Sequence, residues 1–112
     1  MSKKIFIVYG HHNTKKSFNA TIRDTFIDEA KKYGHEIDLI NLHEEKKLHF
    51  FDGTPPNEQV LDYRKRLEKS DVMFMISPCY NLRASAILEN WIDLVLAPKW
   101  FFAFKRVVGN WG

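Results

Sequence analysis

The sequence is poor in cysteine, in long apolar runs and in unbalanced charge, and each shortage excludes a class of protein. Cys79 is the only cysteine, so no disulfide can form within the chain, and a cytoplasmic location fits best. The longest apolar runs, among them Val72–Ile76 and Trp100–Phe104, have five residues each, far fewer than the ~20 that span a bilayer. Seventeen basic against fourteen acidic side chains leave a net charge of +3, which is too small to indicate a nucleic-acid partner.

The composition that remains is typical of one packed globular domain. Of the 112 residues, 45% are hydrophobic, and nine Phe, four Tyr and three Trp can supply a core. This length is enough for one domain with its own core and too short for two, so residues 1–112 are interpreted as a single domain. At the start of the chain a basic pair precedes only a strand-length apolar stretch, which favours a first strand over a signal peptide.

Apolar patterning predicts three strands that alternate with three helices. Ile5–Tyr9 and Val72–Ile76 are continuous apolar runs, as in parallel strands covered on both faces, whereas residues 37–42 form a more polar, outer strand. Helices are predicted before Gly34, at 60–67 and at 87–95. The first helix is indicated by one apolar stripe, formed by Phe18, Ile22, Phe26, Ala30 and Tyr33.

This alternation predicts an α/β fold, namely a three-layer open parallel sheet with strand order 2-1-3. The first and third strands are then neighbours, and the sequence order reverses between them. Ligands of such sheets bind at this reversal, beside the carboxyl ends of the strands. We therefore expect a crevice built from the loops after Tyr9 and after Ser77.

The predicted sheet lacks the later strands of a complete domain. Val72–Ile76 would become a bare edge, because residues 99–112 carry no strong helix or strand pattern. We therefore expect an incomplete domain, either a truncated product or a chain that a partner completes. Such a chain would aggregate, or dimerise through Val72–Ile76 and the aromatic segment Trp100–Phe104.

The loop after the first strand, residues 10–19, has the composition of an anion-binding loop. It brings free backbone N–H groups, Lys15, Lys16, Ser17 and Asn19 to the start of a helix. The alternative is that Ser17 is an ordinary helix cap and the two lysines are a surface pair. The loop also approaches the P-loop spacing, with Gly10, Lys16 and Ser17 in place but Lys15 where the second glycine belongs, which disfavours a nucleotide triphosphatase.

Other candidate chemistries have weaker patterns. The five histidines lack the spacing of a metal site, so no metal is expected. Cys79 after a strand is interpreted as a packing residue rather than a nucleophile, because no third group is placed to orient a base.

Several short motifs, taken together, resemble one family. They are Lys3–Tyr9, His11 followed by Ser17-Phe18-Asn19, Gly34-His35-Glu36, Pro55-Pro56, Pro78 with Ala86-Ile87-Leu88, Trp91-Ile92-Asp93 and Phe102-Ala103-Phe104-Lys105. In this order the chain resembles the flavodoxin-like NAD(P)H:quinone oxidoreductases. The resemblance implies that the flavin phosphate or pyrophosphate is held by His11, Ser17, Phe18 and Asn19. It implies that the isoalloxazine ring is bordered by Pro78, Cys79, Tyr80, Asn81 and Leu82.

The function that this resemblance implies is flavin-dependent. Bound FMN or FAD would take hydride from NAD(P)H and pass it to a quinone-like acceptor, in a protein that forms homodimers. Two alternatives stay open. One is a non-catalytic remnant or regulatory module that keeps the flavin or nucleotide site, and the other is a degenerate P-loop nucleotide binder.

Overall fold

The computed structural model describes residues 2–13, 15–79, 83–96 and 107–110. Within them, none of the helices is both long and apolar enough to cross a membrane. The elements along the chain are β1 (Lys4–Tyr9), α1 (Phe18–Lys32), β2 (Glu36–Asn41), the 3-10 helix η1 (Leu42–Glu44), α2 (Glu58–Glu68), β3 (Val72–Ile76), α3 (Ala86–Val95) and β4 (Val107–Asn110).

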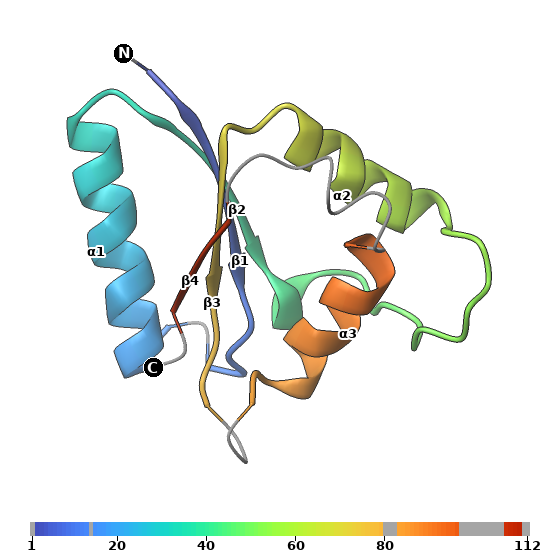
Figure 1. Cartoon of the computed structure of the whole chain (residues 1–112). Helices are drawn as coiled ribbons and strands as arrows, with labels where there is room; N and C mark the ends of the chain where they lie inside the picture. The colour runs from blue at the N-terminus through green and yellow to red at the C-terminus, as the bar shows by residue number, and fades with distance from the viewer. Residues whose placement is uncertain (1, 14, 80–82, 97–106, 111–112) are drawn as a thin grey trace.

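The strands form one parallel sheet in the order β2-β1-β3-β4. Ile5 of β1 lies opposite Ile37 of β2 on one side and Val72 of β3 on the other. Helix α1 covers one face of the sheet, and α2 and α3 cover the other, as Figure 1 shows. The predicted three-layer α/β fold and its 2-1-3 strand order are therefore confirmed.

The central strand β1 shows why its apolar run is continuous. Successive side chains of a strand point to opposite faces, so each face of β1 needs its own apolar cover. Ile5 and Ile7 belong to the cluster on the α1 side, whereas Phe6 and Val8 belong to the cluster under α2 and α3. Trp91 of α3 is fully buried in the second cluster and stacks on Phe6, with ring centroids 6.0 Å apart.

The expectation of a bare edge at β3 was wrong. β4 pairs in parallel with β3, with Met73 opposite Val107 and Ile76 opposite Asn110. The sequence Val-Val-Gly-Asn has only two apolar residues, too few to show a strand period, and its pairing comes from the sheet edge. The predicted route to dimers or aggregates through an open β3 edge is removed, and residues 100–104 lie outside the described residues.

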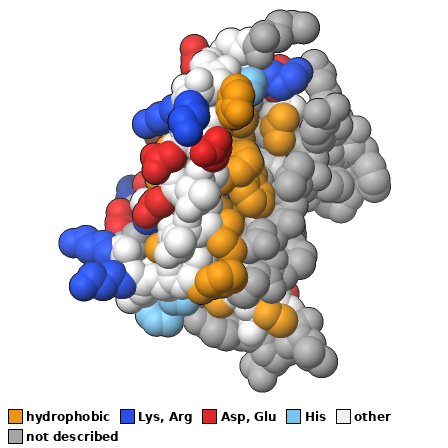
Figure 2. Space-filling model, turned by 90° about the vertical axis from the view of Figure 1, so that its left-hand side faces the viewer, with side chains coloured by type: hydrophobic (Ala, Val, Ile, Leu, Met, Phe, Trp, Pro, Cys, Tyr) orange, Lys and Arg blue, Asp and Glu red, His pale blue; other side chains and the backbone are white. Residues whose placement is uncertain are grey.

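The predicted stripe of α1 was wrong at its ends. Residues four apart are rotated by about 40° around a helix, so a stripe built on that spacing drifts by about 120° from Phe18 to Ala30. Ala30 is buried, but Phe18 and Tyr33 are 70% and 74% exposed. Asn19, Ala20 and Arg23 occupy the buried side at the helix start. Figure 2 shows charged side chains over the outer surface of α1, with a strip of hydrophobic side chains beside them.

Candidate functional site

The loops that follow β1 and β3 meet at the carboxyl end of the sheet. The N–H of Gly10 donates to the carbonyl of Ile76 at 2.8 Å, and the Ser85 hydroxyl donates to the carbonyl of Gly10 at 2.7 Å. A Cβ on Gly10 would lie 2.9 Å from Ser85 Oγ and 3.0 Å from Leu88 Cβ. The absence of a side chain at Gly10 is therefore what lets the two loops touch.

The connection from β3 to α3 is fixed by a second serine. Ser77 Oγ donates to the carbonyl of Pro78 and accepts the N–H of Ser85, both at 2.8 Å. Ser85 precedes α3 but makes no side-chain cap to it, and its hydroxyl donates instead to the Gly10 carbonyl. At the start of this connection, Pro78 is buried and Cys79 is exposed.

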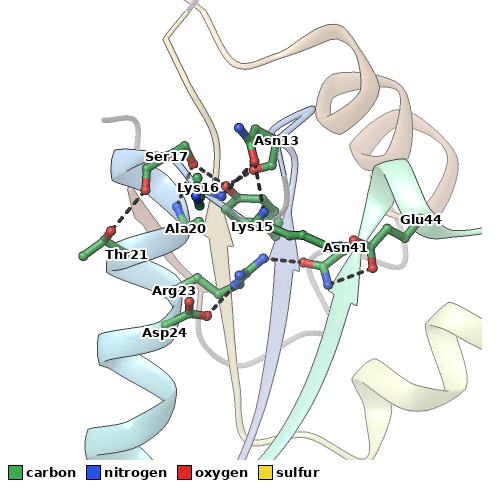
Figure 3. Close-up of polar contacts among 11 residues, drawn as sticks. Asn13, Lys15, Lys16, Ser17, Ala20, Thr21, Arg23, Asp24, Asn41 and Glu44 are labelled. Atoms are coloured by element: carbon green, nitrogen blue, oxygen red, sulfur yellow. Dashed lines mark hydrogen bonds and ion pairs between the residues drawn. The ribbon is translucent and has the colours of Figure 1, made fainter.

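Asn13 organises the loop between Gly10 and α1. Its Oδ1 accepts the N–H groups of Lys15 at 3.1 Å and Lys16 at 2.8 Å, and its own N–H donates to His11 Nδ1 at 2.9 Å. Figure 3 shows the Asn13 side chain turned into the loop. The expectation that the loop offers free N–H groups was wrong for these three, because the Asn13 side-chain oxygen binds two of them and the His11 ring binds the third.

The anion-binding feature that remains is the start of α1. Ser17 Oγ accepts the N–H of Ala20 at 3.0 Å and caps the helix. The first N–H groups of a helix have no partner within it, so that of Phe18 points out of the helix start. Lys15 and Lys16 are exposed beside it. A helix cap and an anion site can coexist at the start of α1, because the Ser17 side chain accepts only one of the first N–H groups of the helix.

The buried Tyr9 contacts this loop, and the buried Arg23 packs against Tyr9. The Tyr9 hydroxyl lies 2.8 Å from both the Asn13 carbonyl and Ser17 Oγ. The Arg23 guanidinium lies 4.6 Å from the centre of the Tyr9 ring. Arg23 also donates to Asp24 Oδ1 at 2.9 Å and to Asn41 Oδ1 at 3.0 Å (Figure 3).

Sequence reasoning missed Tyr9, Arg23, Asn41 and Ser85 as parts of the site. In the sequence, Tyr9 is the last residue of an apolar strand pattern, and Arg23 is one of several charged residues in a helix pattern. The available signal was that Asn19 and Arg23 are four residues apart and therefore share a helix face with Ala20 and Ala30.

Two hollows lie beside the joined loops. One of about 230 Å³ is lined by Gly10, His12, His43, Ser85, Ala86 and Ile87. A more apolar one of about 330 Å³ is lined by Leu42, His43, Lys47, Leu48, Phe50, Ala86, Ile87 and Asn90. The two share His43, Ala86 and Ile87, so they adjoin at the start of α3.

His11 and His43, near the first hollow, have lowered pKa values and therefore favour the neutral form. Burial lowers the pKa of His11, and the charges of His12 and His43 lower it further. Burial and then His12 lower the pKa of His43 in the same direction. The rings of His11 and His12 stack with centroids 4.4 Å apart. Among the described residues, no group of three His, Cys, Asp or Glu side chains is placed to hold a metal ion.

The structure places most of the predicted site residues at the carboxyl end of the sheet, where the two loops meet. His11 is half-buried, Ser17 caps α1, Asn19 is buried and Phe18 is exposed. Pro78 and Cys79 follow β3, and the bond between Gly10 and Ile76 joins the end of β3 to the loop after β1. Tyr80, Asn81 and Leu82 lie outside the described residues.

Comparison with known proteins assigns the family. The family model described as the flavodoxin-like fold matches residues 3–110. Human ribosyldihydronicotinamide dehydrogenase (quinone) is 27% identical over 125 positions, an alignment that covers 89% of this chain and 54% of the human protein. FMN-dependent NADH:quinone oxidoreductase 4 of Burkholderia lata is 25% identical over 120 positions, covering 92% of this chain and 60% of that protein.

The solved structures agree on the fold. The NAD(P)H:quinone oxidoreductase of Methanothermobacter marburgensis superposes with a TM-score of 0.73 at 22% identity, covering 85% of this chain and 53% of that one. The chain thus spans about half the length of the relatives that it matches. The family match, the parallel sheet and the joined loops together show that the chain belongs to the flavodoxin-like family that also contains these quinone reductases.

Proposed function

We propose that the protein binds a flavin phosphate, FMN in the first place, where the loops after β1 and β3 meet. The observation that carries this proposal is the pair of hydrogen bonds made by Gly10, to Ile76 and from Ser85, which join the two loops. The helix start supplies donors and dipole for a phosphate, and the adjoining hollow supplies a less polar space. FMN is favoured over FAD because two of the matched relatives are named FMN-dependent.

The residues of this chain would act by holding and orienting the cofactor. Ser17, the N–H of Phe18 and the exposed Lys16 would bind the phosphate, and His11 would lie at its side. Pro78 and Cys79, with Tyr80, Asn81 and Leu82, would border the ring, as the family resemblance implies. When bound, the flavin supplies hydride transfer, which none of these side chains can perform.

We further propose an NAD(P)H-dependent oxidoreductase that reduces a quinone-like acceptor in the cytoplasm as a homodimer. The names of the curated relatives support the quinone acceptor and the nicotinamide donor. The test is oxidation of NADH or NADPH by the purified chain with FMN and a soluble quinone. The alternative of a non-catalytic module predicts FMN binding without this turnover, and light scattering tests the dimer.

FMN binding itself is tested by titration against riboflavin, which lacks the phosphate. The proposal predicts quenching of flavin fluorescence at one FMN per chain and weaker binding of riboflavin. Ser17→Ala should reduce the difference between the affinity for FMN and the affinity for riboflavin. Asn57→Ala is the matched control, because Asn57 caps α2 through the N–H of Val60 and lies outside the site. Equal affinity for FMN and riboflavin, or no binding, would contradict the proposal.

The P-loop alternative is not favoured by the loop geometry. A P-loop holds phosphates with consecutive backbone N–H groups, but those of Lys15 and Lys16 are used by Asn13. That alternative predicts Mg²⁺-dependent ATP binding that Lys16→Ala abolishes, whereas a flavin site predicts no such requirement for Mg²⁺.

A further inference from the structure

The hydroxyl of Tyr9 contacts both the loop after β1 and the serine that caps α1. Tyr9 is fully buried at the end of β1, and its hydroxyl oxygen is 2.8 Å from the Asn13 carbonyl and 2.8 Å from Ser17 Oγ. Asn13 shapes the loop, and Ser17 caps the helix that follows it. One phenol therefore connects the loop backbone to the side chain expected to meet the phosphate.

The directions of these hydrogen bonds follow from the number of protons. A carbonyl oxygen can only accept, so the single hydroxyl proton of Tyr9 is donated to Asn13. The bond between Tyr9 and Ser17 then needs the serine proton, which makes Ser17 the donor. Ser17 Oγ also accepts the N–H of Ala20. The Ser17 proton is thus directed inward, away from the helix start.

A phosphate at the helix start would need that proton to turn outward. Once Ser17 donates to the phosphate, its oxygen can accept the Tyr9 proton, which only has to rotate from Asn13 to Ser17. No proton leaves its own oxygen. The Tyr9 ring stays in place during this rotation, since it lies under the Arg23 guanidinium and is fully buried.

We propose that Tyr9 is a positioning residue of the phosphate site, whose hydroxyl holds Ser17 Oγ in place and reverses its hydrogen bond when a phosphate arrives. This inference rests on the proposed function, because it assumes that Ser17 contacts the phosphate. It predicts that Tyr9 acts on phosphate-bearing ligands through Ser17 and leaves the rest of the flavin unaffected.

The first test compares two conservative variants. Tyr9→Phe removes the hydroxyl and keeps the ring, and should weaken FMN binding by about three- to tenfold, as the loss of one hydrogen bond does. Riboflavin affinity should stay unchanged. Tyr63→Phe is the matched control, because Tyr63 is also buried and its hydroxyl contacts Glu45 at 2.9 Å in another part of the molecule. It should lower stability and leave both affinities as they are.

The second test is a double-mutant cycle with Ser17→Ala. If Tyr9 acts through Ser17, Tyr9→Phe should change FMN affinity by less than about twofold once Ser17 is alanine. An equal effect in both backgrounds, an equal loss of riboflavin binding, or no effect of Tyr9→Phe would each overturn the inference while leaving FMN binding by the wild type intact. A wild-type chain that does not distinguish FMN from riboflavin would overturn the proposed function, and this inference with it.

Discussion

The hydroxyl of Ser85 donates a 2.7 Å hydrogen bond to the carbonyl oxygen of Gly10, although the two residues are 75 positions apart. Both are buried, so water cannot replace this bond if it is lost. The bond joins the loop that precedes α1 to the connection that leads into α3. The positions of the two halves of the proposed flavin site therefore depend on each other.

Ser85→Ala should leave the Gly10 carbonyl without its side-chain donor. We expect a loss of about 1–3 kcal/mol in the free energy of unfolding, the cost of an unsatisfied buried acceptor, together with weaker FMN binding. Urea denaturation and flavin titration measure the two effects. Ser70→Ala is the matched control, since Ser70 is buried and donates to the Arg66 carbonyl at 2.9 Å away from the site. If both variants bound FMN equally well, the bond would serve stability alone.

Gly10→Ala tests the close approach of the two loops. The new methyl group would lie 2.9 Å from Ser85 Oγ and 3.0 Å from Leu88 Cβ, so one loop must move. We expect a loss of about 1–3 kcal/mol in stability, as overpacking causes, and reduced FMN affinity. Gly34→Ala is the comparison, because Gly34 has a φ of 81° with nothing within 4 Å of an added Cβ. It should cost stability through backbone strain and leave FMN binding unchanged.

The sheet order and the meeting of the two loops at the candidate site could be predicted from the sequence because they follow from burial. Ile5–Tyr9 and Val72–Ile76 are apolar on both faces, which makes them central, and neighbouring central strands bring their following loops together. Ser17 ends one of these loops and Asn19 lies in the first turn of the helix that follows, and their role in the site stays a prediction.

The remaining features depend on contacts that no local pattern records. The desolvation of the buried Arg23 is compensated by its neighbour Asp24 and also by the Tyr9 ring and Asn41, which are not near it in sequence. Asn13 could have faced water instead of taking the Lys15 and Lys16 N–H groups. β4 is too short to be recognised without the strand that it pairs with.

Phe18→Ser separates ligand binding from stability. Phe18 is 70% exposed in the first turn of α1, so its removal should change the free energy of unfolding by less than about 0.5 kcal/mol. If the ring covers the bound flavin, FMN affinity should fall by about two- to tenfold. Tyr33→Ser, equally exposed at the other end of the helix, should affect neither quantity. Unchanged FMN binding in Phe18→Ser would remove Phe18 from the proposed site.

The lowered pKa of His11 predicts how the stability of the fold depends on pH. Burial chiefly, and then the charges of His12 and His43, lower the pKa of His11 below the ordinary value of 6.5. The folded chain therefore binds a proton at His11 less readily than the unfolded chain does. The stability contributed by neutral His11 is complete above pH 6.5 and is lost as the pH falls through the lowered pKa.

Urea denaturation across this range measures the effect. The wild type should lose stability as the pH falls below 6.5, and His11→Gln, which cannot take up a proton there, should lose less over the same interval. His43→Gln should act in the same direction, since burial and His12 also lower the pKa of His43. At alkaline pH both histidines are neutral, so the measurement there isolates the packing cost of each substitution. If His11→Gln followed the wild-type curve in parallel, protonation of His11 would not limit the stability of the fold.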